Sequence, residues 1–227
     1  MSEIFDAYES ALKDKGRGRS ISISGAGMAG GGYYEKVSIN GSGKIEGDVE
    51  AKEVRVAGSA FFKGSLTADN VKAAGAIKVY GTLRARKASF AGAIKVNGCL
   101  DSEELSVAGA VSAGCLKSAK ARIEGGIRVS GEVTGDIIEF KILDDSVMGE
   151  VKVRKLEVLR ARSYNFSELL KSLLGKMNPT LEARKIEAEE VVFSDVTVRA
   201  PVYAKRIILV GKTKIEGEIQ GELIRKK

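Results

Sequence analysis

The stretch that decides the fold is residues 37 to 133, whose centre, residues 54 to 92, reads VRVAGSAFFKGSLTADNVKAAGAIKVYGTLRARKASFAG. One apolar position recurs at a constant interval, at Val37, Val54, Val71, Ala88 and Leu105, and a glycine recurs with it at Gly41, Gly58, Gly75, Gly92 and Gly109. A fixed period of this length is typical of one supersecondary unit stacked on copies of itself, because a single unit cannot bury its own apolar face. The sequence therefore predicts a solenoid.

Each repeat has the pattern of short strands separated by corners. In residues 92 to 100, GAIKVNGCL, the apolar Ile94, Val96 and Leu100 alternate with polar side chains, and Gly98 permits a bend. Alternation with period two indicates a strand with one buried face. We expect an all-β parallel β-helix with about 16–18 residues per coil, in which neighbouring coils pair as parallel strands about 4.8 Å apart.

The repeat divides the chain into four segments. Residues 20–163 form the main body of the expected β-helix, and residues 180–227 form its C-terminal coils. Residues 1–19 and 164–179 break the repeat, and each places apolar side chains at the spacing of an amphipathic helix. These side chains are Ile4, Phe5 and Tyr8 in the first segment and Phe166, Leu169, Leu170 and Leu173 in the second.

Two roles are open for each expected helix. The N-terminal helix, on its glycine and arginine linker, is expected either to cap the first coil or to contact a membrane or a protein partner. The inserted helix is expected either to pack on the solenoid wall or to make a similar contact through its apolar face.

The composition argues against an enzyme. The 227 residues include 27 glycines, two prolines and no tryptophan, which suits a narrow interior filled by small and branched side chains. The chain has no histidine, so proton transfer at neutral pH would need a carboxylate or lysine with a shifted pKa, and the nearest candidates, Asp144 and Asp145, are expected in a solvated turn. The glycine-rich residues 25–32 lead into another strand and do not predict a phosphate loop. We expect no enzyme activity, cofactor, metal or nucleotide.

The net charge of +7 is modest for a chain of this length, but part of it is ordered. Lys44, Lys78, Lys95 and Arg128 share one outward position of the repeat, which Phe61 and Ser112 interrupt. Such a basic ladder can follow an anionic polymer or a lipid surface, whereas a solvated face with interleaved acidic side chains is the simpler interpretation. Aromatic residues make up only 6% of the chain, so we expect no stacking platform for nucleic acid.

The two cysteines, Cys99 and Cys115, each lie between a glycine and an inward leucine in consecutive repeats, so we expect them to be stacked neighbours. Adjacent strands place their Cα atoms at a separation that allows a disulfide. Acidic residues near the N-terminus, and the absence of a run of about 18 apolar residues, favour a cytoplasmic location, where thiols usually stay reduced. A disulfide and the packing of two free thiols both remain open, and a catalytic or metal-binding role is the weakest alternative.

Three phrases of the repeat, INGSGKIEGDVEAKEVRVAG (39–58), GAIKVYGTLRARKASFAG (75–92) and GKTKIEGEIQGE (211–222), resemble bactofilins, a family of polymer-forming cytoskeletal proteins. The resemblance implies a right-handed β-helix, whereas the period itself fits either hand. It also implies a nucleotide-independent filament whose core domains join end to end, while short tails meet membranes or partners. The chain departs from the family in its larger number of coils and in its helical insertion.

A solenoid leaves unpaired backbone groups at its first and last coils, and these can pair with a further copy. We therefore expect self-assembly through Ile21 and Ile23 at one end and Leu223 and Ile224 at the other. The expected partner is the chain itself, together with a protein partner or the inner face of the membrane. The alternative is a non-polymeric β-helical scaffold that presents a face or a helix to a protein or a membrane.

Overall fold

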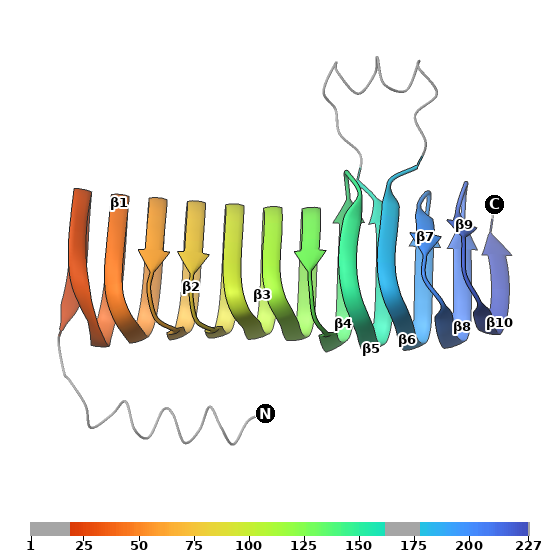
Figure 1. Ribbon diagram of the computed structural model, residues 1–227, viewed down its shortest axis with the longest axis horizontal. Coiled ribbons are helices and arrows are strands. Elements are labelled where there is room, and N and C mark those ends of the chain that lie inside the picture. The colour runs from red at the N-terminus through yellow and green to blue at the C-terminus, as the bar shows by residue number, and fades with distance from the viewer. Residues whose placement is uncertain (1–18, 162–177, 227) are drawn as a thin grey trace, which may run out of the picture.

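The computed structural model describes residues 19–161 and 178–226, and these residues form one rod of stacked coils (Figure 1). The strands are β1 (Ser20–Phe62), β2 (Leu66–Val79), β3 (Leu83–Val129), β4 (Val133–Ile142), β5 (Ser146–Arg160), β6 (Thr180–Ser194), β7 (Thr197–Arg199), β8 (Val202–Val210), β9 (Lys214–Ile215) and β10 (Ile219–Lys226). All strand pairings among these residues are parallel. The expected all-β parallel solenoid is confirmed, with about ten coils.

The repeat of the sequence is the hydrogen-bonding register of the structure. Val54 pairs with Val71 and Val71 pairs with Ala88, so each coil advances the chain by one sequence repeat. Between β6 and β8 the coil is slightly shorter, and Val191 pairs with Ile207. Because a one-residue slip within a strand would turn its apolar side chains outward, these changes in coil length are absorbed at the corners.

Strand β6 pairs with β5 in register, although the chain between their paired residues is longer than elsewhere. Leu156 pairs with Val191, which is about twice as far along the sequence as in the regular coils. The helices expected within residues 1–19 and 164–179 fall almost wholly outside the described residues. Within residues 19–161 and 178–226 no helix occurs, and so none there is long and apolar enough to cross a membrane.

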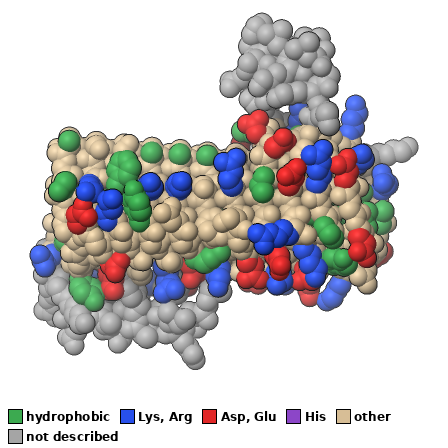
Figure 2. Space-filling view, in the orientation of Figure 1, with side chains coloured by type: hydrophobic (Ala, Val, Ile, Leu, Met, Phe, Trp, Pro, Cys, Tyr) green, Lys and Arg blue, Asp and Glu red, His purple; other side chains and the backbone are tan. Residues whose placement is uncertain are grey.

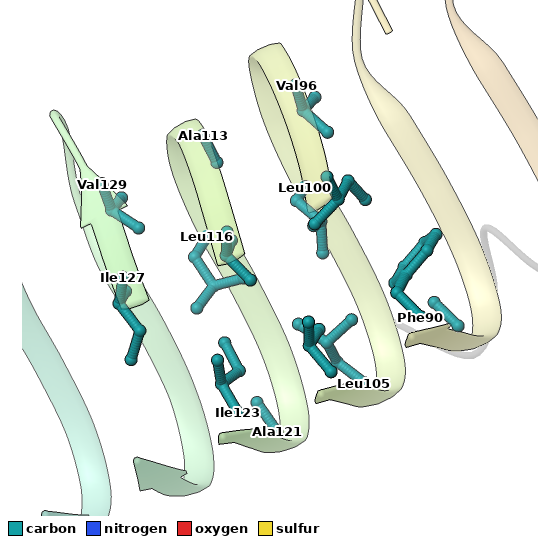
Figure 3. Packing of buried hydrophobic residues seen from close by; sticks show 14 of the residues in the cluster. Phe90, Val96, Leu100, Leu105, Ala113, Leu116, Ala121, Ile123, Ile127 and Val129 are labelled. Atoms are coloured by element: carbon teal, nitrogen blue, oxygen red, sulfur yellow. The ribbon is translucent and has the colours of Figure 1, made fainter. Parts of the chain in front are cut away.

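Branched and aromatic side chains fill the interior of the rod. Phe140 and Phe193 are fully buried. Val96, Ala113 and Val129, from three successive coils, form one row of inward side chains (Figure 3). Burying one large apolar side chain stabilises a fold by about 1.5–3 kcal/mol, so stacked rows of this kind hold the coils together. In the described part of the chain, every buried side-chain nitrogen or oxygen has a hydrogen-bond partner.

A ladder of glycines shapes one corner of the coils. Gly58, Gly75 and Gly92 occupy paired positions in neighbouring coils. Gly75 has a φ of +125°, and a Cβ atom at this position would overlap the carbonyl oxygen of Gly58. The corner therefore requires glycine both for its backbone conformation and for the close approach of the neighbouring coil.

Candidate functional site

The C-terminal end of the rod exposes apolar side chains at positions that are inward elsewhere. Strand β10 pairs with β8, and no described strand covers its other edge (Figure 1). Ile219 and Leu223 pair with Val202 and Ile207, both of which are fully buried. Ile219 is 39% exposed and Leu223 is 43% exposed, because no further described coil lies over them. This end therefore combines an open strand edge with uncovered core positions.

The two residues predicted for this interface have different places in the structure. Leu223 continues the inward row of Ile207, whereas Ile224 pairs with Ile208 on the outer surface. A register shift between Gln220 and Glu222 sets this alignment. Ile219 was not predicted for the interface, although it follows Val202 by one repeat, which was a usable signal.

A charged residue also occupies an inward position of the last coil. Arg225 pairs with Leu209, which is buried, while Arg225 itself is exposed. Inward charges at a sheet edge discourage unspecific pairing with other chains. A chain that adds to this end must therefore offer an acceptor to the guanidinium group of Arg225 or leave it at the rim of the contact.

The N-terminal end is built differently from the C-terminal end. Ile23 is 7% exposed and belongs to the core, and Ile21 is half-buried against it. The glycine-rich part of this coil is closed by the hydroxyl group of Tyr34, which donates to the carbonyl oxygens of Gly30 and Gly31 at 2.9 and 3.2 Å. Of the two predicted residues at this end, Ile21 is therefore the more available for contact.

The two cysteines lie in neighbouring coils. The Cα atoms of Cys99 and Cys115 are 4.5 Å apart, and a disulfide joins the two side chains. No cysteine is left free. In this form the chain has no thiol for metal binding or nucleophilic chemistry, and the bond ties one coil covalently to the next.

Surface charges are arranged mainly as ion pairs between neighbouring coils. Arg206 donates to Glu190 at 3.0 Å, and Arg199 donates to Glu182 at 3.2 Å and to Glu216 at 3.0 Å. Hydrogen bonds from Lys214 and, second, from Arg199 hold the pKa of Glu216 below its usual range. A carboxylate that acts as a general acid at neutral pH needs a raised pKa, and the shift at Glu216 is in the opposite direction. The described residues contain no cluster of potential metal ligands.

One long face of the rod carries a shallow groove of about 400 Å³, which we call the lateral groove. Its floor contains the exposed Ala76, Ala93 and Ala110, one from each of three successive coils, beside the buried Ile77 and Ile94. Figure 2 shows small hydrophobic side chains in a row along the upper edge of the N-terminal half, with basic side chains below the row. The groove therefore runs along the rod and crosses several coils.

Basic side chains form one wall of the lateral groove. Lys78 and Lys95 occupy paired positions in adjacent coils, and Arg128 lines the groove further along. Among the described residues, none of these three cations forms an ion pair. Lys78 instead lies 4.4 Å from the ring centre of Tyr80. Asp145 is the one acidic residue among the described residues that line the groove.

The basic ladder is therefore only partly neutralised. Lys44, which precedes the groove in the same ladder, forms an ion pair with Glu46. Hydrogen bonding to Lys44 is the main reason that the pKa of Glu46 is lowered. The interpretation of a face with interleaved acidic side chains holds for Lys44, but not for the three cations that line the groove.

The remaining contact residues predicted from the sequence are outside the described part of the chain. They are Ile4, Phe5, Tyr8, Phe166, Leu169, Leu170 and Leu173. The two ends of the rod and the lateral groove lie within the described residues, and the groove floor was not recognised in the sequence. The signal was present, since alanine recurs at an outward position two residues before the basic ladder.

Comparison with known proteins does not assign the chain to a family. No protein-family model, no curated protein and no solved structure matches it.

Proposed function

We propose that the chain is a structural, bactofilin-like protein that assembles end to end into nucleotide-independent filaments in the cytoplasm. The observation that carries the proposal is the uncovered last coil, where Ile219 and Leu223 are exposed at positions that are buried one coil earlier. A right-handed coil is part of the proposal, since bactofilins have this hand. An enzymatic role is not part of it, because the shifted pKa values belong to surface groups, most of them paired with opposite charges.

Two forces support assembly at this end without an energy source. A second copy would continue the backbone hydrogen bonding of β10 and would cover the half-exposed Ile219 and Leu223. Covering the remaining surface of one such side chain contributes about 1 kcal/mol, and each new backbone hydrogen bond contributes about 0.5–1.5 kcal/mol. The exposed Arg225 restricts the added surface to one that can accept its hydrogen bonds.

Negative-stain microscopy of the purified chain without nucleotide tests this proposal, with sedimentation as a second measurement. We expect filaments from the unaltered chain and their loss in the double variant Ile219→Glu and Leu223→Glu. Ile137→Glu is the matched control, because Ile137 is 37% exposed on the side of the rod, away from both ends. Monodisperse particles at all salt and protein concentrations would refute the filament, and filaments from the double variant would refute this interface.

The second candidate function is a non-polymeric scaffold that binds a protein partner or a membrane. The lateral groove favours it, because an apolar floor beside cations that form no ion pair with any described residue is suited to an amphipathic anionic partner. The double variant separates the two functions. The double variant should abolish assembly if the C-terminal end is the functional surface. It should leave partner binding intact if the lateral groove is the functional surface.

A further inference from the structure

Among the described residues, the lateral groove carries an excess of positive charge beside an apolar floor. Lys78, Lys95 and Arg128 have no ion pair among the described residues, whereas most basic side chains elsewhere on the rod face a carboxylate. We propose that this groove docks the acidic amphipathic segment at the start of the chain itself, residues 3–9. The proposal does not depend on filament formation.

The charges of the segment match those of the groove in spacing. Residues 3–9 read EIFDAYE, with Glu3, Asp6 and Glu9 at every third position. If the segment is helical, as its pattern predicts, these carboxylates recur about every 4.5 Å along the helix axis, since the rise is about 1.5 Å per residue. The paired Lys78 and Lys95 lie one coil apart, which is about 4.8 Å in a parallel sheet. A helix parallel to the rod can therefore place two successive carboxylates against Lys78 and Lys95.

The apolar side chains of the segment also suit the groove. Phe5 and Tyr8 lie next to the acidic positions on the predicted helix. Methyl groups such as those of Ala93 keep the floor low, so that aromatic rings can approach the neighbouring backbone closely. The exposed Phe61 lines the same groove at its N-terminal side and offers an aromatic partner.

The linker is long enough for docking. Residues 10–18 connect the segment to Arg19, and such a linker spans about 30 Å when extended. Lys78 lies three coils beyond the first coil, or about 14 Å along the rod. It also lies about half a coil around the rod from Arg19, or roughly 25 Å over the surface. Docking on the same rod uses nearly the full linker.

Docking would have a consequence for the other role predicted for this segment. The side chains that face the groove would include Phe5 and Tyr8, which are the same residues expected to contact a membrane or a partner. One segment cannot do both at once. The groove therefore acts as a competitor for the membrane or partner contact, and its strength falls with salt because the cations are solvent-exposed.

Photo-crosslinking of the full chain tests the docking. Phe5 is replaced by p-benzoylphenylalanine, and mass spectrometry identifies the crosslinked peptide. We expect crosslinks to residues 61–95, and about a tenfold lower yield when Lys78→Glu and Lys95→Glu are combined, since each variant removes an exposed ion pair and replaces it with a like-charge contact. The matched control is Lys72→Glu with Lys120→Glu, two exposed lysines outside the lateral groove.

A charge swap makes the test independent of folding defects. Asp6→Lys combined with Lys95→Glu is expected to restore part of the crosslink that Lys95→Glu alone removes. Crosslinks within one chain and between two chains both support docking, and the mass of the product distinguishes them. Crosslinks confined to other surfaces, or a yield that the groove variants leave unchanged, would overturn it. So would vesicles containing phosphatidylglycerol that bind through Lys78 and Lys95 while no groove crosslink forms, since the groove would then serve a lipid surface.

Discussion

Replacing Gly75 with alanine tests how strictly the glycine corner determines the fold. Gly75 has a φ of +125°, which a residue with a Cβ atom rarely adopts, and the added Cβ would overlap the carbonyl oxygen of Gly58. The backbone conformation alone costs about 1–3 kcal/mol. The overlap is with backbone rather than with a flexible side chain, so relieving it must move the coil and weaken its hydrogen bonds at about 0.5–1.5 kcal/mol each. We expect Gly75→Ala to lower the free energy of unfolding by about 3 kcal/mol.

Gly126→Ala provides the matched control. Gly126 faces open space, with no atom within 4 Å of an added Cβ, and its φ is outside the left-handed region. Alanine there should be neutral or should stabilise by about 0.4–1 kcal/mol, because it restricts the unfolded chain. Urea unfolding followed by circular dichroism measures both variants. Equal midpoints for Gly75→Ala and Gly126→Ala would refute the argument that the corner requires glycine.

Three further predictions concern the core, the ion pairs and the disulfide. Phe140→Ala should destabilise the rod by about 3–5 kcal/mol in the same urea assay, because the side chain is fully buried. The pKa of Glu216 is lowered in the folded chain by Lys214 and Arg199. The stability that the ionised Glu216 contributes is therefore present above its unfolded pKa and is lost as the pH falls through its folded pKa. In a series of urea titrations, the difference in stability between the unaltered chain and Glu216→Gln should shrink below about pH 4.5. Cys115→Ala should lower the thermal midpoint measured without reductant, since opening a loop of about 15 residues costs about 3 kcal/mol, and a midpoint equal to that of the unaltered chain would contradict this.

The fold could be predicted because the register in which its strands pair equals the period of the sequence repeat. Val54, Val71 and Ala88 recur at the spacing at which the strands pair, and the glycines recur with them. A period identifies which residues stack, since only inward positions need to stay apolar in every coil. It does not fix the hand of the coil. It also gives no information on segments that leave the repeat.

The candidate sites were harder to predict. Some lie where the length of the repeat changes, and others consist of outward residues, which the repeat does not require to be apolar. The alignment of Leu223 rather than Ile224 with Ile207 depends on an irregularity after Gln220, and this irregularity decides which side chain points inward. The state of the cysteines depends on the redox environment as well as on their proximity. The groove floor is made of alanines at outward positions, where a small residue has no distinctive pattern.

The long step between the paired Leu156 and Val191 has a mechanical consequence. The hydrogen bonds of the rod run along its length, so tension on the two ends pulls neighbouring coils apart one after another. Each released coil lengthens the chain by about 60 Å, since about 17 extended residues span about 3.3–3.6 Å each. The longer chain between the paired Leu156 and Val191 would release about 120 Å, and the residues enclosed by the Cys99–Cys115 disulfide would release none. When a single molecule is stretched from its ends, its force–extension curve would therefore show one step that is longer than the others and would lack one step.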